Sequence, residues 1–476
     1  MKSHSISISI ALVTCSILLY LYSRLFRCPS RLRHIPQVPL PPLILSFLSG
    51  ESEDIRIQKV ILPFARSCRT GIVVVWALGS WYVHVLDYKF AKELMENKSI
   101  RKEQPNEDML FWRFTGRHNI FFVEGDEWRK HSSVVRASLH GNVPIDTFCA
   151  LGRTLFSLLG QGGSFCWSDI SHRITLDAVG IAVMGHNFNA LEHPESTFVQ
   201  IYRHVMQDVS RPLYVAFPTL EWWFPRKDVV QRMDNLVSLF LEILEEKRGR
   251  PGNDFITYLI QTPGMTEAEY RDSIVTLFMA GHDTTAGALS SLIFYFAFFP
   301  TYQARARDEV LSVLGPDSDP NIPDFDKMPF LQACIRESMR MNSPSTVTIP
   351  RVSSETLHIG GYALPAGIPI VLNIHAVLHN SQTWKDPGAF NPERFISANS
   401  TDDGKWMPFG AGPRQCPARN FALYELRTLS CMLLREYRWN SPQESIHSSG
   451  KLKNRFSAFA LNLPYDLYIN FVRITK

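Results

Sequence analysis

The chain has 476 residues, of which 45% are hydrophobic and 20% charged, so it can form one large domain or two ordinary ones. Its net charge of +4 is too small, and its basic residues are too dispersed, for a nucleic-acid-binding surface. The eight cysteines form no C-x-x-C pair and no zinc-like spacing, which excludes a disulfide scaffold and favours reducing surroundings.

The N-terminus is apolar. Residues 6–26 contain one charge, Arg24, and a helix of this length can span roughly 30 Å of hydrocarbon. The residues that follow are bulky and basic rather than small, which favours an uncleaved transmembrane helix over a signal peptide or a buried core helix. Because the positive charges follow the apolar stretch, the remaining chain is predicted to face the cytosol. The proline-rich residues 35–42 are predicted to be a stiff extended link rather than a helix.

The next segments have clear periodicity. Residues 71–87 contain two β-like runs around a Gly-Ser turn, which predicts a hairpin. Helical spacing of apolar residues predicts helices over 229–248, 267–299 and 329–341. The helix over 267–299 carries "AGHDTT" at mid-length, and glycine and threonine are poor helix formers. We therefore expect a local distortion there.

The C-terminal third contains short β-like runs. Residues 357–359 and 368–372 are separated by Gly-Gly and Pro-Ala-Gly turns, and residues 456–472 contain further extended pieces. Together with the helical segments, these runs predict a mainly α fold with a minor β part.

The stretch "FGAGPRQCPARN" (409–420) contains a cysteine in an unusual setting. It is not a dinucleotide-binding loop, because Gln415 stands where the third glycine is needed and no strand precedes it. The leucines after Cys416 have helical spacing, so a helix is predicted to start at about Pro417. A cysteine at a helix N-terminus is where the macrodipole stabilises a thiolate, as a nucleophile or a metal ligand. An inert buried cysteine is the alternative.

This stretch resembles the cysteine loop of the cytochrome P450 superfamily, the heme-thiolate monooxygenases. The family pattern F-x-x-G-x-R-x-C is matched by Phe409, Gly412, Arg414 and Cys416. One departure is Ala418, since the family usually has glycine there, and we interpret it as a tighter turn. The resemblance covers about the whole chain and is closest to fungal microsomal members.

Further motifs follow in the family's order. "ESMR" and "NPERF" supply Glu337, Arg340 and Arg394, which resemble the buried Glu–Arg–Arg network that supports the cysteine loop. An E-x-x-R pattern alone is common on surface helices. It becomes specific here because it occurs in the family's order among the other motifs. "AGHDTT" resembles the acid–alcohol pair of the central helix, with Asp283 and Thr284 in the catalytic positions.

The resemblance also implies groups that hold the heme carboxylates. "GDEWRKHSSVVRASL" resembles the early helix whose tryptophan, here Trp128, and a basic residue meet a heme propionate. The usual basic position is Ser132, so Arg129 or His131 would have to substitute. Two further cations are implied by the resemblance, Arg351 and Arg414.

The predicted substrate pocket is hydrophobic, with few fixed polar contacts. Each pocket position could equally be plain core. By resemblance its residues are Phe278, Met279 and Ala280 on the central helix and Thr346, Val347 and Thr348 after the E-x-x-R helix.

The resemblance implies heme b with a cysteine thiolate ligand at Cys416, O2, and NADPH electrons from a separate flavoprotein reductase. No NAD or flavin fingerprint is present in the chain itself. The resemblance further implies an endoplasmic reticulum enzyme with a single-pass anchor at 1–27, a proline-rich linker at 28–50 and a cytosolic catalytic domain at 51–476. The residues expected to form a cationic docking face are Arg129, Lys130, Lys405 and Arg419.

Three functions are compatible with these features. The leading hypothesis is a membrane-bound monooxygenase that oxidises a lipophilic small molecule, either a terpenoid or other secondary metabolite, or a foreign compound. A heme-thiolate isomerase or dehydratase would need no external electrons, and Asp283 and Thr284 argue against it. A membrane-tethered binding protein with vestigial motifs is the third, and the intact Cys416, Glu337 and Arg340 argue against it.

Overall fold

The computed structural model describes residues 25–474, apart from Lys98, 141–142 and 397–403, together with four single positions between 16 and 23. The predicted transmembrane segment therefore lies almost wholly outside the described residues. Within the described part, no single helix is long and apolar enough to cross a bilayer. Helices α15 (Glu267–Phe298) and α16 (Pro300–Leu314) pass the length and composition criteria only as a pair bent by 110°.

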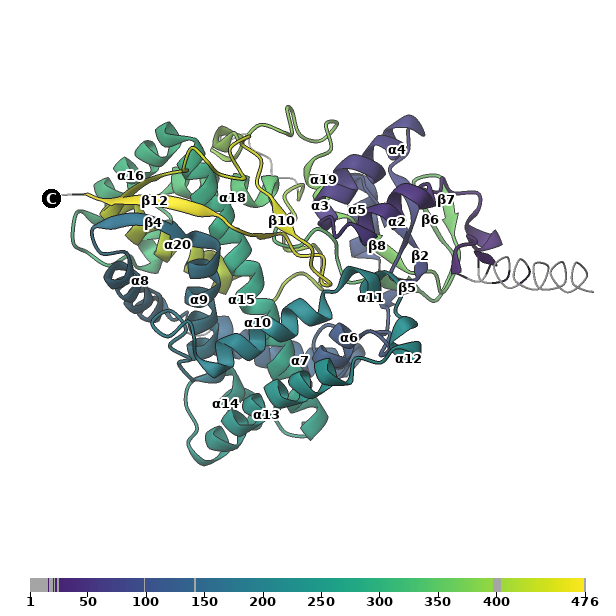
Figure 1. Cartoon of the computed structure of the whole chain (residues 1–476), viewed down its shortest axis with the longest axis horizontal. Helices are drawn as coiled ribbons and strands as arrows, with labels where there is room; N and C mark the ends of the chain where they lie inside the picture. The colour runs from purple at the N-terminus through teal and green to yellow at the C-terminus, as the bar shows by residue number, and fades with distance from the viewer. Residues whose placement is uncertain are drawn as a thin grey trace, which may run out of the picture.

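The described chain is mainly helical, as predicted. Figure 1 shows most helices gathered around α15, with a sheet and the N-terminal helices set to one side. The helices are η1 (Ser30–Leu32), α2 (Leu40–Leu48), α3 (Glu53–Arg56), η2 (Ile57–Ile61), α4 (Leu62–Ser67), α5 (Tyr88–Glu96), α6 (Leu110–Thr115), α7 (Gly125–His140), α8 (Ile145–Leu159), α9 (Trp167–Val179), η3 (Gly180–Met184), α10 (Thr197–Val209), α11 (Pro212–Ala216), α12 (Leu220–Trp223), α13 (Lys227–Gly249), α14 (Phe255–Ile260), α15 (Glu267–Phe298), α16 (Pro300–Leu314), α17 (Ile322–Phe325), α18 (Pro329–Met341), α19 (Ile374–Leu378), η4 (Pro392–Phe395) and α20 (Arg419–Glu436).

The strands form one five-stranded sheet, in the order β1-β2-β8-β5-β3, and three small sheets, β4-β12-β9, β6-β7 and β10-β11. The strands are β1 (Ile72–Ala77), β2 (Ser80–Val85), β3 (Ile100–Lys102), β4 (Gly162–Cys166), β5 (Arg351–Ser353), β6 (Leu357–Ile359), β7 (Tyr362–Leu364), β8 (Ile370–Leu372), β9 (Tyr437–Asn440), β10 (Asn454–Arg455), β11 (Leu463–Pro464) and β12 (Tyr468–Arg473).

The predicted hairpin is confirmed as β1 and β2, which pair from Ile72↔Val85 to Ala77↔Ser80. Its two-residue turn is Leu78-Gly79, and both residues have positive φ, of 50° and 73°. This is the backbone of a turn that matches the twist of a hairpin, and glycine adopts it without steric cost. Strand β8 pairs in parallel with β2 of the hairpin, and this pairing brings the 344–372 segment next to the N-terminal part of the chain.

Helix α15 runs through the centre of the molecule, and most of its 32 residues are buried. It starts with a capping box in which Thr266 and Glu269 bond to each other's backbone N–H groups. The distortion expected at "AGHDTT" does not interrupt it, because α15 is α-helical throughout. Thr284 and Thr285 instead donate their hydroxyl protons to the carbonyls of Ala280 and Gly281.

The proline-rich segment is only partly as predicted. Residues 36–38 are extended and bond to β1, since Val38 N–H donates to Val74 O at 2.9 Å and Val74 N–H donates to Pro36 O at 2.8 Å. The prediction is wrong from Leu40, where α2 begins with proline in its first turn. Proline is tolerated there because the first N–H groups of a helix have no intrahelical partner. The segment therefore packs on the hairpin.

Candidate functional site

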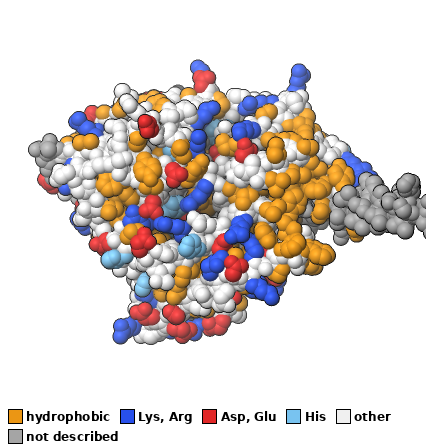
Figure 2. Space-filling view, in the orientation of Figure 1, with side chains coloured by type: hydrophobic (Ala, Val, Ile, Leu, Met, Phe, Trp, Pro, Cys, Tyr) orange, Lys and Arg blue, Asp and Glu red, His pale blue; other side chains and the backbone are white. Residues whose placement is uncertain are grey.

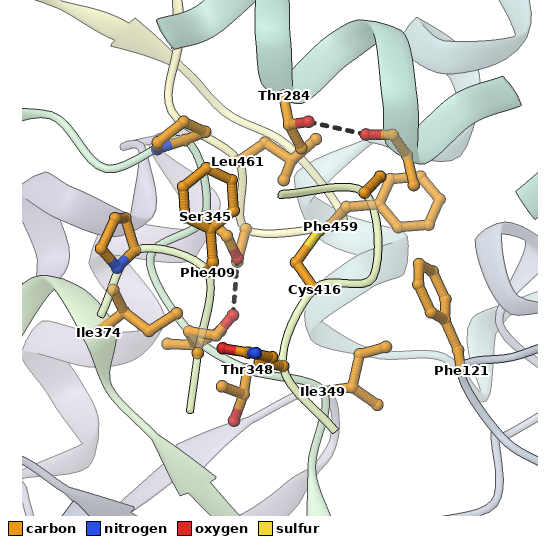
Figure 3. Close-up of a pocket in the computed structure, with 18 of the residues that line it drawn as sticks. Phe121, Thr284, Ser345, Thr348, Ile349, Ile374, Phe409, Cys416, Phe459 and Leu461 are labelled. Carbon is orange, nitrogen blue, oxygen red and sulfur yellow. Dashed lines mark hydrogen bonds between the residues drawn. The ribbon is translucent and has the colours of Figure 1, made fainter. Parts of the chain in front are cut away.

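A cavity of about 790 Å³ lies between α15, the 409–418 loop and the 344–351 segment. Figure 3 shows Cys416 and Thr284 at this cavity, with Phe121, Phe459 and Ile349 around them. Most lining groups are apolar or aromatic, as expected of a small-molecule site.

The cysteine loop depends on glycine at one position. Gly412 has φ of +72°, and a Cβ on it would lie 2.6 Å from the carbonyl oxygen of Met95. Any other side chain would clash with the backbone and strain the turn. The loop then closes through Cys416 N–H, which donates to Phe409 O at 2.9 Å. Helix α20 begins at Arg419, two residues beyond the predicted start at Pro417.

The protein alone does not stabilise a thiolate at Cys416. Burial raises the pKa of this thiol to about 11, although a backbone hydrogen bond from Ala418 and the charge of Arg419 act in the opposite direction. The helix N-terminus favours the thiolate, but it does not by itself outweigh the desolvation of the sulfur. A cation at the sulfur, such as a metal ion, is what would deprotonate a thiol in this setting.

The predicted acid–alcohol pair is divided between two environments. Thr284 lines the cavity, and its Oγ1 donates to Ala280 O at 2.7 Å (Figure 3). Asp283 is buried and does not line the cavity. It accepts a hydrogen bond from the Tyr202 hydroxyl at 3.3 Å and lies beside two imidazoles.

Glu337, Arg340 and Arg394 are brought together. Arg340 Nε and Nη2 donate to the two carboxylate oxygens of Glu337 at 2.7 and 2.9 Å, and both side chains are fully buried. Arg394 Nε adds a bond to Glu337 Oε1 at 3.2 Å. A buried pair of this kind is favourable only when its remaining donors and acceptors are also satisfied.

The remaining donors of Arg340 bind the chain that leads toward the cysteine loop. Its Nη1 donates to Leu378 O and Pro387 O, both at 2.9 Å, and its Nη2 donates to Ala389 O at 3.2 Å. Helix α18 also holds the far end of this chain, because Trp406 Nε1 donates to Arg336 O at 2.9 Å. The network thus positions the segment that precedes the loop, while direct bonds to Cys416 come from the loop itself.

Two of the predicted cations lie on the cavity wall. Arg414 donates to Val123 O at 2.8 Å and Glu124 Oε1 at 3.0 Å, and its guanidinium lies 4.8 Å from the Trp128 ring centroid. Arg414 Nη1 and Arg351 Nε are buried and have no hydrogen-bond partner among the residues that the structure describes. Burial and the charge of Arg414 lower the pKa of Arg351 to about 10. Buried donors without acceptors indicate a missing anionic group.

Lys102 is a third cation at this wall that the sequence analysis did not identify. It lines the cavity and stands directly opposite Arg351 in the β3–β5 pair. Like charges directly opposite each other in a sheet are destabilising. Burial, followed by the charges of Arg351 and Arg414, lowers the pKa of Lys102 well below its usual value. Three cations thus face one carboxylate, that of Glu124, which fits the two carboxylates of the heme implied by the sequence.

The substitutes proposed for the basic group at Ser132 are wrong. Arg129 is exposed and paired with Asp126, and His131 is buried against Glu269 at 3.2 Å. Neither lines the cavity, whereas Ser132 does. The side chain one helical turn beyond Ser132, Arg136, also lines it.

Some of the predicted pocket residues line the cavity, and others do not. Met279, Ala280, Val347 and Thr348 line the cavity. Phe278 instead lies in an aromatic core, with ring contacts to the residues Phe188, Phe198, Tyr202, Phe240 and His282. Thr346 is buried and bonds to Ala460 O through its hydroxyl at 2.8 Å. Both are therefore corrections to the predicted pocket.

Further lining residues had no signal in the sequence. They come from segments distant in the chain, and no motif or spacing marks them. The aromatic ones are Phe47, Tyr82, Phe111, Trp112, Phe121, Phe421, Phe456 and Phe459.

We predict that Arg340→Ala destabilises the protein by about 3–5 kcal/mol, because it leaves the Glu337 carboxylate buried without its bidentate partner. A fall in the melting temperature measures this. The control is Arg305→Ala, which breaks an exposed pair with Glu393 and should cost about 0–1 kcal/mol. Equal melting temperatures for the two variants would show that the network carries no stability.

The comparisons with known proteins agree with this geometry. The family model described as Cytochrome P450 matches residues 36–465. The chain is 33% identical to Cytochrome P450 4B1 of Homo sapiens over 363 residues, which cover 70% of this chain and 71% of the relative. It is 25% identical to Cytochrome P450 4F5 of Rattus norvegicus over 90% of this chain and 88% of the relative.

Among solved structures, the cytochrome P450DA heme domain matches with a TM-score of 0.79 and 20% identity over 93% of this chain and 98% of that structure. This similarity shows the shared fold. The family match spans the cysteine loop, the central helix and the Glu337–Arg340 helix. The chain therefore belongs to the cytochrome P450 family, and it is a monooxygenase that uses heme with a cysteine thiolate, O2 and electrons supplied by a reductase.

Proposed function

We propose that Cys416 is the axial ligand of the heme iron, and that the enzyme oxidises a lipophilic small molecule in the cavity above it. The observation that carries this proposal is the cavity itself, into which Cys416 and Thr284 both face (Figure 3). When bound, thiolate-ligated heme supplies the O–O bond cleavage. The iron would also supply the positive charge that a buried Cys416 thiolate requires.

The heme carboxylates fit the cationic wall. Arg351 and Arg414 each have a buried donor without an acceptor among the described residues, and Glu124 is the one carboxylate that acts on the pKa of Lys102. Trp128 carries an indole N–H that can only donate. We assign these four residues to the carboxylates, with Phe409 and Gly412 shaping the loop on the thiolate side.

Thr284 is proposed to direct protons during O2 reduction. Its hydroxyl lies at the cavity, where it can donate a hydrogen bond or hold a water molecule. Asp283 precedes it on α15 and contacts Tyr202 and His172 outside the cavity, and it is proposed to relay protons from there. A purely structural role for Thr284, through its bond to Ala280 O, is the alternative.

Electrons are proposed to come from an NADPH-dependent flavoprotein reductase that binds near the cysteine loop. Arg419 is exposed at the start of α20, and its guanidinium lies 5.6 Å from the Trp406 ring centroid. Burial and the charges of Arg419 and Arg427 lower the pKa of Arg336 to about 10, which indicates a dense cationic cluster. Of the other residues expected on this face, Arg129 and Lys130 are each paired with a carboxylate.

The substrate is proposed to be lipophilic because the cavity is mostly apolar and extends toward an apolar surface. Leu78 and Val215 line its outer part, and α11, which carries Val215, also carries the exposed Leu213. We refer to the exposed apolar residues here as the apolar patch. They are Leu45, Leu48, Leu213, Trp222, Trp223 and Phe224.

The apolar patch supports membrane attachment. Figure 2 shows hydrophobic side chains gathered over the side of the molecule where α2, α11 and α12 lie in Figure 1. Trp222 and Trp223 are 74% and 79% exposed, which is unusual for adjacent tryptophans in contact with water. With the apolar residues 6–26, this favours an enzyme of the endoplasmic reticulum membrane whose catalytic domain faces the cytosol.

A terpenoid or another secondary metabolite is the proposed substrate class, and a foreign compound is the second candidate. Apart from the charged groups on the walls, the polar lining groups include the small hydroxyls of Thr284, Ser345 and Thr348. Ser345 is already bonded to Val347 O at 2.7 Å. Such a wall favours recognition by shape rather than by a charged group on the substrate.

Cys416→Ser should leave the fold intact but abolish thiolate ligation. The reduced protein with carbon monoxide should lose the red-shifted Soret band, and NADPH-dependent product formation should fall to background. The matched control is Cys149→Ser, because Cys149 is a buried cysteine that does not line the cavity. Retention of the band in Cys416→Ser would contradict the ligand assignment.

Thr284→Ala should keep heme, substrate binding and NADPH oxidation, yet release more hydrogen peroxide and less product. The reason is that alanine can neither donate a hydrogen bond nor hold a water molecule. Parallel assays of peroxide, product and NADPH measure this coupling. Thr285→Ala is the control, since its hydroxyl makes the same kind of bond to the preceding turn. Unchanged product per NADPH would leave Thr284 with a structural role, worth about 1 kcal/mol.

A dye attached at Trp223→Cys should report contact with lipid. In a Cys68→Ser background, which removes the exposed cysteine of the described part of the chain, the full-length protein in vesicles should show a blue shift in dye emission at this position. Gly249→Cys, at the far end of α13, is the control and should show none. Equal emission at the two positions would place the apolar patch in water.

A further inference from the structure

Asp283 is the centre of a polar cluster that joins three helices. His172 Nδ1 on α9 and His282 Nε2 on α15 both lie 3.3 Å from Asp283 Oδ1. The Tyr202 hydroxyl on α10 donates to Asp283 Oδ2, also at 3.3 Å. The cluster lies beside the cavity rather than in it, because none of these four side chains lines the cavity.

His172 is the imidazole of this cluster that reaches solvent. Its side chain is 18% exposed, compared with 2% for His282 and 5% for Asp283. Figure 1 shows α9 and α10 alongside α15, with β10 beside them. Arg455 on β10 covers the outer edge of His172, so this edge is where water meets the cluster.

The contacts of His172 define which nitrogen carries its proton. Arg455 Nη2 lies 3.0 Å from His172 Nε2, and a guanidinium can only donate. Nε2 of the neutral ring is therefore the acceptor, and Nδ1–H donates to Asp283. This arrangement disfavours a metal ion among His172, His282 and Asp283, because the nitrogen that would bind the metal already carries a proton.

Asp283 itself is a poor store of protons. Burial alone would raise the pKa of this carboxyl group, but His282 and the hydrogen bond from His172 lower it to about 2. Burial lowers the pKa of His282 to about 4, so this second imidazole is neutral at pH 7. Asp283 therefore remains a carboxylate that accepts hydrogen bonds and orients the His172 ring. A different group must take up the proton from water.

Helix α9 leads from this outer edge to the cavity. His172, Thr175 and Val179 follow one another along the face that packs on α15. Thr175 Oγ1 lies 3.2 Å from His282 O, and Val179 lines the cavity. The two helices approach closely here, since a Cβ on Gly281 would lie 3.1 Å from Val179.

We propose that His172 is the residue through which protons pass from solvent to the catalytic cavity. A proton from water binds at His172 Nε2 as Arg455 moves aside, and the Nδ1 proton passes to Asp283 Oδ1. The resulting carboxylic acid gives this proton to a water molecule held at Thr284 and becomes a carboxylate again. Each cycle transfers one proton and no electrons. The partly exposed ring then returns to its first tautomer by exchange with solvent, because Nε2 gives its proton to water and Nδ1 takes one up. This inference rests on the proposed function, because O2 reduction is what consumes the protons.

The test uses His172→Gln in the full-length heme protein. Glutamine can still donate to Asp283 but does not titrate. We expect the carbon monoxide band and melting temperature of the wild type, with product formation slower by about 10- to 100-fold, at the lower end of what a positioned acid–base group contributes. Peroxide per NADPH should rise, and the pH profile of coupling should differ from that of the wild type. His204→Asn, an exposed histidine on α10, is the control and should match the wild type.

Arg455→Gln is the second variant. It keeps a donor for His172 Nε2 but removes the positive charge beside it, so the pH profile of coupling should differ from that of the wild type. A merely structural role for the cluster predicts no such difference. The charged and titratable groups that face His172 are Asp283, His282, Tyr202 and Arg455. All four are unchanged in His172→Gln.

Two results would overturn the proposal. One is wild-type coupling and an unchanged pH profile in His172→Gln. The other is inhibition of the wild type by micromolar zinc that EDTA reverses and that His172→Gln abolishes, which would assign the cluster to a metal ion. Failure of the proposed function looks different, because the wild type itself would then lack the carbon monoxide band or NADPH-dependent product.

Discussion

The bidentate bond between Arg340 and Glu337 is the interaction on which the catalytic half of the molecule depends. It is fully buried, and the same guanidinium binds three carbonyls of the 378–389 segment. Charges without water must be matched on every side, so this segment has one position in which all donors are satisfied. That position sets where the chain continues toward Trp406 and the cysteine loop.

Charge balance also explains the cavity. On one wall, Lys102, Arg351 and Arg414 exceed the negative charge available to them, while Cys416 is held as a thiol by burial. One bound group can balance both the excess positive charge of the wall and the buried sulfur, because it brings carboxylates to the first and a positive centre to the second. The site is therefore incomplete as protein alone, and its two unfavourable features are complementary to one cofactor.

The parts of the fold that could be predicted from the sequence are those that depend on local pattern. The 71–87 hairpin and the 329–341 helix were predictable because turn residues and apolar spacing lie within a few residues of each other. Lys102 was not, because only the pairing of β3 with β5, about 250 residues apart in the chain, places it beside Arg351. Phe278 and Thr346 were misplaced because a motif locates a segment but not the face that each side chain takes.

The opposed cations of β3 and β5 have a consequence for the life of the protein in a cell. A ligand that binds only the folded state stabilises it in proportion to the logarithm of its concentration. When heme is scarce, the repulsion between Lys102 and Arg351 acts on an edge strand of only three residues, which is the kind of element that opens first. Opened chains are substrates for cellular proteases. The amount of this enzyme should therefore follow heme supply through protein turnover, even when its synthesis is constant.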